Sequence, residues 1–300
     1  MSIPPYPEFV PLEFGLKDEL HPRLSLTVDG VSEFTFAGLY LFRKRYHYRI
    51  SRAPDGGFIV SGEQPGSMDS GAGGKKFFMT PCASPGPEIL AALFEAHDYW
   101  KNISESVLAP EREYLERMGI EIVEDRDNFD YLYFRSDLAE LAGKKFHKKK
   151  NLVNAFRNAY PNHEARHLEM DLSPQALEVL ERWRADKGED GDYTAAREAL
   201  DLFGSLKLRG ALFYVNGAPA GWCLGESLAK GRMFVIHFEK GTDGIKGIYQ
   251  YMNQAFAASL PRFFTYINRE QDLGDEGLRQ AKETYRPCGF VKKYRGIWRG

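Results

Sequence analysis

The chain contains little cysteine and no long hydrophobic run. Its three cysteines, Cys82, Cys223 and Cys288, are odd in number and form no CxxC pair, which argues against a disulfide framework and a zinc knuckle. No apolar run approaches the roughly 18 residues that cross a bilayer, and the first residues, MSIPPYPEF, lack the parts of a signal peptide. We therefore expect a cytoplasmic protein without a transmembrane segment or a metal site.

Net charge is also small. Forty Lys and Arg residues face 42 Asp and Glu residues, which gives a formal charge of -2. The hydrophobic fraction of 43% and the aromatic fraction of 14% exclude a mainly disordered chain. A length of 300 residues is enough for two domains of roughly 150 residues each. The composition therefore predicts a globular protein of two domains.

Positive charge is concentrated in the segment 143–154, GKKFHKKKNLVN. At 100° per residue, Phe146, Val153, Phe156 and Tyr160 lie on one face of a predicted helix. Lys149 falls within this apolar face, where a lysine must reach water or find an anionic partner. A solvated basic face is the simpler alternative, but the misplaced lysine favours a ligand-binding surface. The predicted binding residues on the helix are Lys144, His147, Lys148, Lys149 and Asn151.

The order of predicted elements is repeated. The first half gives strands at 46–52, 58–63 and 76–82, a helix at 87–99, a strand at 102–107, a helix at 110–118 and a strand at 120–124. The second half gives strands at 210–215, 220–227 and 233–239, a helix at 248–259, a strand at 263–268, a helix at 275–286 and a strand from residue 290. We interpret this order as a duplicated α/β unit, with domains at 1–135 and 136–300.

Two glycine-rich loops were considered as phosphate sites. PGSMDSGAGG, 65–74, precedes a strand rather than a helix, so we expect a hairpin connection there. EKGTDGIKGIY, 239–249, precedes a helix, and its predicted phosphate-binding residues are Gly244, Lys246 and Gly247. A tight strand-to-helix turn remains the alternative for this second loop.

The segment YINREQD, 266–272, offers groups for acid–base chemistry. Strand alternation predicts that Asn268 and Glu270 share one face, so that an amide and a carboxylate converge. Glu270 or Asp272 is the candidate general base or amine-binding anion, although Asp272 could instead cap the following helix. His237 and Glu239 are expected to alternate onto one face and line the same cleft.

The helix after YINREQD is predicted to have two stripes. Leu278, Ala281 and Tyr285 would pack against the core. Arg279 and Lys282 would form a parallel basic stripe that binds the phosphate groups of a donor. If this stripe meets the helix at Lys144, the two elements form a cationic cleft.

Three motifs carry a resemblance to a known family: DYLYFRSDLAELAGKKFHKKKN (130–151), YINREQDLGDEGLRQAKETYRP (266–287) and GFVKKY (289–294). They resemble a bacterial family related to the C-terminal domain of phosphatidylglycerol lysyltransferases, over nearly the whole chain. The repeated order of elements is similar to the tandem GNAT-type acyl-CoA N-acyltransferase fold. The resemblance implies an α/β (α+β) fold of two GNAT-like domains, each a mixed, mostly antiparallel sheet flanked by helices.

The same resemblance implies an activity: transfer of an acyl or aminoacyl group from a phosphate-bearing donor to an amine or hydroxyl. The donor would be acyl-CoA or, as in the Fem-type peptidoglycan aminoacyltransferases, aminoacyl-tRNA. Either would act as a co-substrate rather than a tightly bound cofactor. We place the expected active site in the C-terminal domain. The alternative is a non-catalytic protein that binds RNA or a phosphorylated ligand through the same cationic faces.

Overall fold

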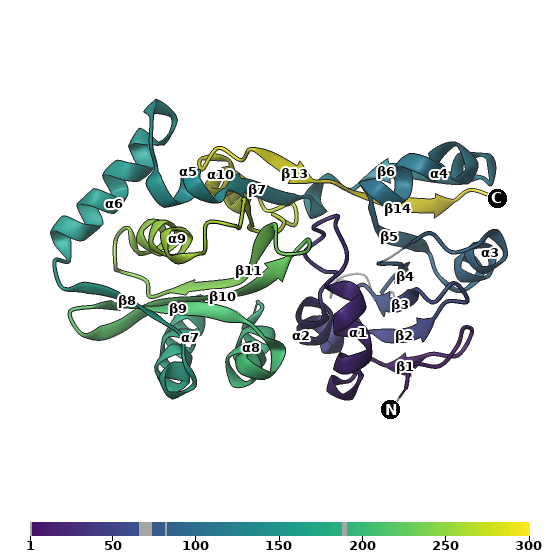
Figure 1. Cartoon of the computed structure of the whole chain (residues 1–300), viewed down its shortest axis with the longest axis horizontal. Helices are drawn as coiled ribbons and strands as arrows, with labels where there is room; N and C mark the ends of the chain where they lie inside the picture. Colours follow the sequence, from purple (N-terminus) through teal and green to yellow (C-terminus); the bar gives the residue numbers. More distant parts are fainter. Residues whose placement is uncertain (1, 66–73, 82, 188–190) are drawn as a thin grey trace. The chain divides into compact units, whose positions relative to one another are not determined.

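A computed structural model describes residues 2–65, 74–81, 83–187 and 191–300. The chain divides into two compact units, Met1–Asp130 with Val291–Gly300, and Tyr131–Phe290. Each unit is built on one seven-stranded sheet with helices against it (Figure 1). Most of the loop 65–74, for which a hairpin connection is expected, lies outside the described residues.

The sheet of the first unit has the strand order β1-β2-β3-β4-β5-β14-β6. The neighbours β4 and β5 run parallel, with Phe77 opposite Tyr99, whereas the pairs on either side of them are antiparallel. The bounds of its strands are β1 Val10–Pro11, β2 Arg49–Arg52, β3 Phe58–Glu63, β4 Lys76–Met79, β5 Tyr99–Ser104, β6 Ile120–Glu124 and β14 Lys293–Trp298.

The sheet of the second unit has the order β13-β7-β12-β11-β10-β9-β8. Here β11 and β12 form the parallel pair, and the pairs around them are antiparallel. Both sheets are thus mixed and mostly antiparallel, as expected. The bounds are β7 Asp130–Phe134, β8 His163–His167, β9 Arg209–Val215, β10 Ala218–Leu228, β11 Met233–Gly241, β12 Tyr266–Asn268 and β13 Gly289–Val291.

Helices cover the sheets. In the second unit, α7 and α8 lie on one side of the sheet and α9 on the other (Figure 1). The longer helices of the first unit are α1 Lys17–Leu24, α2 Phe36–Tyr46, α3 Pro87–Ala96 and α4 Glu105–Arg117. Those of the second are α5 Arg135–Glu140, α6 His147–Ala159, α7 Ser173–Lys187, α8 Tyr193–Leu206, α9 Ile248–Ser259 and α10 Glu276–Glu283, with the short 3-10 helix η3, Lys144–Phe146, before α6.

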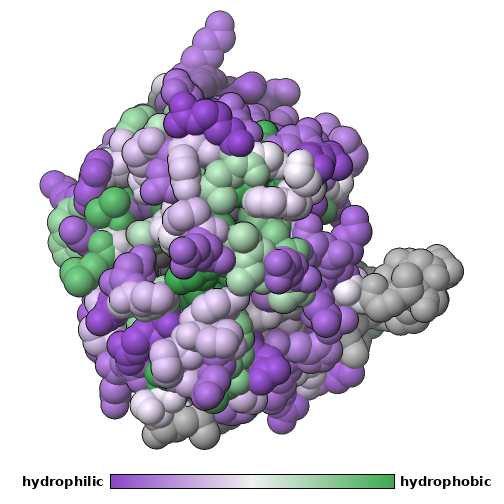
Figure 2. All heavy atoms as spheres, turned by 90° about the vertical axis from the view of Figure 1, so that its right-hand side faces the viewer, coloured by the Kyte–Doolittle hydropathy of each residue, from purple (hydrophilic) through white to green (hydrophobic). Residues whose placement is uncertain are grey.

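The basic segment is helical and is held down by its apolar face, as predicted. Phe146, Val153 and Phe156 are buried. Phe146 and Val153 pack with Leu141 in a small cluster, and Phe156 joins the main core of the second unit. Seen from the right-hand side of Figure 1, the surface is mostly hydrophilic, with hydrophobic residues in small interrupted areas (Figure 2).

The structure corrects several predicted elements. The strand expected at 102–107 ends at Ser104, whose hydroxyl accepts a hydrogen bond from the Val107 amide and begins α4. The strand expected from residue 290 is two strands, β13 in the second sheet and β14 in the first. The division at residue 135 therefore differs from the observed one in residues 131–135 and in the last ten residues, where β14 pairs with β5 and β6. The sequence reading also missed β7 and α8.

Within the described residues, no helix is long and apolar enough to span a bilayer.

Candidate active site

The site is built where two parallel strands of the second unit separate. The pairing of β11 with β12 runs from Met233 and Tyr266 to Val235 and Asn268 and ends there. β11 continues to Gly241 paired with β10, whereas the chain leaves β12 as the segment Arg269 to Asp272. The two diverging segments carry the polar side chains described below.

His237 lies on β11 between two carboxylates. Its Nε2 is 3.1 Å from Glu226 Oε1 and its Nδ1 is 2.7 Å from Glu270 Oε1. The imidazole is only 2% exposed and Glu270 is 23% exposed. Burial alone would lower the pKa of His237, but the hydrogen bonds to Glu226 and Glu270 raise it to about 10. His237 is therefore an imidazolium that donates to both carboxylates at neutral pH.

The expected alternation of His237 and Glu239 fails because of a β-bulge. Leu224 and Gly225 are consecutive on β10, but their partners on β11 are Phe238 and Ile236, so His237 is an extra residue. Downstream of the bulge, Glu239 lies opposite Cys223 and bonds with Asn253 of α9 and with Arg269. His237 instead bonds with Glu226 and Glu270.

Arg269 is a second enclosed cation of the site. Its Nη2 donates to Glu239 Oε2 over 2.6 Å, and its guanidinium lies 5.0 Å from the ring of Tyr285 and 5.8 Å from that of Tyr133. Burial opposes the charge, but Glu239 raises the pKa of Arg269 above its ordinary value. Its Nε and Nη1 are buried without a hydrogen-bond partner among the described residues, as is the Tyr285 hydroxyl. These donors are available to an anion that enters the site.

Lys149 approaches the same aromatic ring from α6. Its Nζ is 3.8 Å from the centroid of Tyr285, a cation–π contact. Among the described residues no carboxylate pairs with this ammonium. Burial, and then the positive charge of Arg269, lower the pKa of Lys149 to about 8. The misplaced lysine of the sequence is thus a partly desolvated cation beside a second cation.

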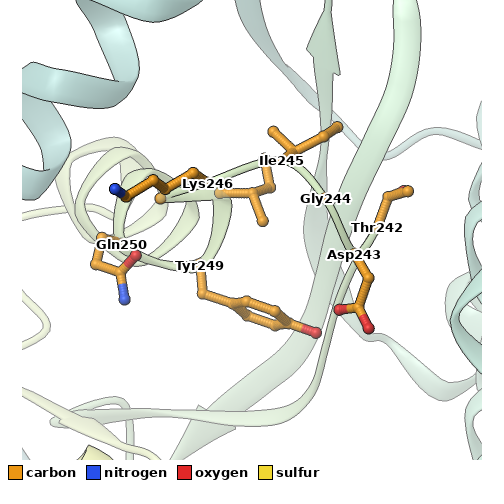
Figure 3. Close-up of a pocket in the computed structure, with 9 residues that line it drawn as sticks. Thr242, Asp243, Gly244, Ile245, Lys246, Tyr249 and Gln250 are labelled. Carbon is orange, nitrogen blue, oxygen red and sulfur yellow. The ribbon is translucent and has the colours of Figure 1, made fainter. Parts of the chain in front are cut away.

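The loop between β11 and α9 forms a pocket of about 200 Å³. Gly244 and Gly247 have positive φ angles of 83° and 86°, and Gly247 caps the N-terminus of α9. The Tyr249 ring extends towards Thr242 and Asp243, which follow the end of β11 (Figure 3), and its hydroxyl bonds with the backbone of Gly241. The pocket is lined by Thr242, Asp243, Gly244, Ile245, Lys246, Gly247, Ile248, Tyr249 and Gln250.

The loop offers partners to an anion as well as one opposing charge. It combines the Lys246 side chain with the N-terminal amides of α9, whereas Asp243 is acidic. Thr242 Oγ1 is buried without a partner among the described residues. Gly247 lets α6 approach closely, since a Cβ there would lie 3.2 Å from the Cβ of Phe156.

Asn268 and Asp272 make contacts that support the backbone. Asn268 Oδ1 accepts a hydrogen bond from the Glu270 amide, and Glu270 has a φ of 55°. Asp272, which is fully buried, accepts bonds from the Tyr131 hydroxyl, the Gly274 amide and the Arg279 guanidinium. Burial would raise the pKa of Asp272, but the bonds from Arg279 and Tyr131 hold it well below its usual range. Asp272 therefore fixes the loop, whereas Glu270 faces the separation of the strands.

The predicted stripes of α10 are inverted. Leu278 and Ala281 are exposed and Lys282 is buried, against the prediction, whereas Tyr285 is buried as predicted. Lys282 Nζ donates to the backbone carbonyls of Arg269, Glu270 and Gln271 over 2.5 to 3.0 Å. The basic side of the helix faces inward because it bonds with the carbonyls and the Asp272 carboxylate of the preceding loop. Lys149 of α6 contacts Tyr285, which follows α10, whereas the predicted basic residues Arg279 and Lys282 bond with the loop 269–272.

The remaining predicted residues of α6 lie on its exposed side. Lys144, His147, Lys148 and Asn151 are all exposed, and Asn151 Nδ2 is 3.5 Å from His147 Nδ1. They are separate from the enclosed group around Arg269, which Lys149 joins.

Sequence reasoning missed Arg269, Glu239 and Asn253 as members of the enclosed group. Alternation sent Arg269 to the face opposite Glu270. No local signal marks this group, because Glu239, Tyr133 and Tyr285 are distant from Arg269 along the chain. The pairing of Glu239 with Arg269 depends on the bulge, which has no turn residue to mark it.

Comparisons with known proteins are consistent with this architecture. A protein from Mycoplasmoides gallisepticum, described as uncharacterized, is 25% identical over 188 residues, which are 59% of this chain and 58% of that protein. A conserved protein of unknown function from Bacteroides thetaiotaomicron has a crystal structure with a TM-score of 0.85 and 28% identity, covering 97% of this chain and 99% of that one.

A second similar structure is the C-terminal domain of a putative lysylphosphatidylglycerol synthetase from Agrobacterium fabrum. Its TM-score is 0.62 at 13% identity, with 96% of this chain and 93% of that one covered. This likeness bears on the fold alone, and it confirms the expected class of two tandem GNAT-like domains. The family described as phosphatidylglycerol lysyltransferase, C-terminal, matches residues 25–296. The match confirms the resemblance seen in the motifs, and the chain belongs to this family.

Proposed function

We propose that the second unit catalyses transfer of an acyl or aminoacyl group from a phosphate-bearing donor to an amine or hydroxyl acceptor. The observation that carries the proposal is the contact of Lys149 and Arg269 with one ring, that of Tyr285, with Glu270 next to Arg269 in the chain where β11 and β12 separate. Two cations with spare donors and a partly exposed carboxylate are the groups that such a transfer requires. Membership in a lysyltransferase family makes an aminoacyl group the first to test.

The carboxylate of Glu270 acts on the acceptor in this proposal. It either removes a proton from the attacking amine or hydroxyl or holds the ammonium of an amino acid. His237 bonds to one of its oxygens and orients it, which leaves the second oxygen for the substrate. Asn268 fixes the backbone that presents Glu270.

The cations act on the donor. Lys149 has no carboxylate partner among the described residues, and Arg269 has two donor nitrogens without one. Both can stabilise the negative charge that develops on the carbonyl oxygen, or bind a phosphate of the donor. Lys246 and the N-terminal amides of α9 supply a further phosphate site next to Gly244 and Gly247. Arg279 and Lys282 act indirectly, because both bond to the loop 269–272, which carries Arg269 and Glu270.

The experiment compares the two donor classes directly. The protein is incubated with ¹⁴C-lysyl-tRNA or ¹⁴C-acetyl-CoA, with phosphatidylglycerol vesicles or a small amine as acceptor, and labelled product is counted. We expect transfer from one donor, and we expect Lys149→Met and Glu270→Gln to lower kcat/KM at least about 100-fold. The matched control is Lys230→Met, because Lys230 is an exposed lysine of the same unit. Absence of both binding and turnover with either donor would contradict the proposal.

A second candidate function rests on the exposed side of α6. Lys144, His147 and Lys148 there face solvent and fit a polyanion such as RNA. A binding protein without catalysis predicts RNA affinity that falls steeply with salt, is abolished in Lys148→Glu and is retained in Glu270→Gln. Unchanged binding by Lys148→Glu would contradict this second function.

A further inference from the structure

The first unit contains a pocket of about 460 Å³ that the proposed transferase site does not use. Pockets of this volume are in the range that holds a small molecule. Its walls come from the N-terminal segment, the strands β2 to β4 and the helix α3. Phe9 and Ser61 line it together with its titratable and charged residues, which are Tyr6, His47, Arg49, Glu63, Lys76 and His97.

Ser61 and His97 form a hydrogen-bonded pair in this pocket. Ser61 Oγ is 2.8 Å from His97 Nε2, and His97 Nδ1 is 2.8 Å from the backbone carbonyl oxygen of Leu93. A carbonyl oxygen only accepts, so Nδ1 carries the proton and Nε2 is left to accept from the Ser61 hydroxyl. Burial lowers the pKa of His97, which keeps the ring neutral near pH 7. A neutral imidazole bonded to a serine hydroxyl can act as its base.

Regular elements hold the pair in place. Ser61 lies in β3 and is paired with Arg49 of β2 and Phe78 of β4. His97 follows the last residue of α3, and the Leu93 carbonyl that orients its ring belongs to that helix. The imidazole also makes an edge contact with the Phe78 ring at 5.5 Å. The hydroxyl therefore stands on a strand, and the base directly follows the helix that carries its orienting carbonyl.

The pocket also holds positive charge and an apolar wall. Lys76 lines the same pocket, and its positive charge adds to the effect of burial in lowering the pKa of His97, whereas Asp98 opposes it. Arg49 lines the same pocket and donates to the Phe9 carbonyl. Tyr6 and Phe9 are in edge contact at 6.0 Å and form the apolar part of the wall. A cation near the hydroxyl can stabilise an oxyanion, and the aromatic rings can hold an acyl chain.

We propose that Ser61 is a nucleophile and that this pocket hydrolyses small carboxylic esters with an apolar acyl group. Ser61 Oγ forms a bond to the ester carbonyl carbon while its proton passes to His97 Nε2. The carbon–alkoxide bond then breaks, and the alcohol leaves with that proton. Water adds to the acyl-serine in the same way, giving its proton to His97, and the carboxylic acid is released with Ser61 restored. Lys76 faces the carbonyl oxygen as it becomes negative.

The test uses a fluorophosphonate probe and p-nitrophenyl butyrate on the full chain. We expect the probe to label the intact protein, and peptide mass spectrometry to place the label on Ser61. Ser61→Ala should lose the label and ester hydrolysis, and His97→Gln should slow both at least about 100-fold. Ser106→Ala is the matched control, because Ser106 is an exposed serine of the same unit.

Two further readouts distinguish catalysis from a structural bond. Hydrolysis should persist below pH 6.5, since the pKa of His97 is lowered. Lys149→Met should leave labelling unchanged, so failure here is separate from failure of the transferase proposal. The inference is overturned if the intact protein is not labelled, if the label maps to another residue, or if a folded Ser61→Ala protein still hydrolyses the ester.

Discussion

At the scale of single residues, Lys149 combines burial with a neighbouring like charge. Because its pKa falls from an ordinary 10.5 to about 8, protonation costs free energy in the folded state. Natural proteins keep such residues at sites that bind ligands more often than elsewhere. The cost is therefore a measurable sign of function.

Lys149→Met should raise the free energy of unfolding at pH 7 by about 1 kcal/mol, a figure reduced for solvent screening. The gain should be complete below pH 8, shrink as the pH rises from 8 to 10.5, and vanish above that, where the lysine is neutral in both states. Urea unfolding at pH 7 and pH 10.5 measures it. A variant that is less stable than the parent at pH 7 would contradict this reading of Lys149.

His237 should show the opposite dependence. Its folded pKa of about 10 lies above the unfolded value of 6.5, so its stabilising charge is fully present below pH 6.5 and is lost as the pH rises to 10. His237→Gln should cost about 3–5 kcal/mol at pH 6, because Glu226 is left buried without a cation. The difference between the two proteins should narrow at pH 10, as guanidinium unfolding would show. An equal difference at both pH values would mean that the ring serves only for packing.

The residue-scale predictions from sequence succeeded where a helix carried the pattern. The helical wheel identified Lys149 as misplaced because 100° per residue fixes which side chains share a face. It could not supply the neighbours Arg269 and Tyr285, which come from other elements. On β11 alternation failed at His237, because one bulged residue reverses every later side chain and leaves no mark in composition.

At the scale of elements, two glycines of one loop offer a matched comparison. Gly244 and Gly247 share nearly the same positive φ, but a Cβ at Gly244 would meet open space, whereas one at Gly247 would press on Phe156. Gly244→Ala should cost about 1 kcal/mol for the backbone alone. Gly247→Ala should cost about 2–4 kcal/mol, because α6 must also shift. Thermal unfolding of both variants measures the difference in stability. Equal losses of stability would show that α6 can shift without a cost in free energy.

The inverted helix α10 makes a second prediction at this scale. Lys282→Met should cost about 2–3 kcal/mol, since three backbone carbonyls lose a charged donor. Leu278→Lys should change stability by no more than about 0.5 kcal/mol, because Leu278 is 41% exposed. Chemical denaturation of the two variants tests which side of α10 faces the core. A larger loss of stability for Leu278→Lys than for Lys282→Met would support the predicted orientation, in which Leu278 faces the core.

Sequence reading misassigned this helix because it assumed that apolar residues turn inward. The loop 269–272 presents carbonyls and a carboxylate to α10. Leaving these acceptors buried without donors would cost more free energy than exposing Leu278 to water. The hydrophobic periodicity of α10 does not show that the neighbouring loop has acceptors to be paired. By contrast, the bounds of α9 were predicted correctly at 248–259, since its buried positions follow helical spacing against one sheet.

At the scale of the whole molecule, the path of the chain decides which fragments fold. A fragment of residues 131–290 contains the second sheet almost whole and should unfold cooperatively. A fragment of residues 136–300 lacks β7 and carries β14 without its neighbours β5 and β6, so we expect it to aggregate. Circular dichroism and size-exclusion chromatography distinguish the two. A stable, monomeric 136–300 fragment would favour the division predicted from sequence.

The duplicated unit was predictable because both halves have the same order of elements. The exchange of the last strand was not, since GFVKKY has the same β-forming residues in either sheet. The strands that pair with β14 are β5 and β6, which lie far away in the chain, so the local sequence does not identify them.

The return of β14 to the first sheet also sets an order of events during synthesis. That sheet needs a strand between β5 and β6 that is among the last residues to leave the ribosome. Proteins commonly complete their N-terminal domain first as the chain emerges. Here a chain released at residue 290 holds nearly all of the second sheet but lacks β14 of the first, so it should have a protease-resistant second unit and a protease-sensitive first one.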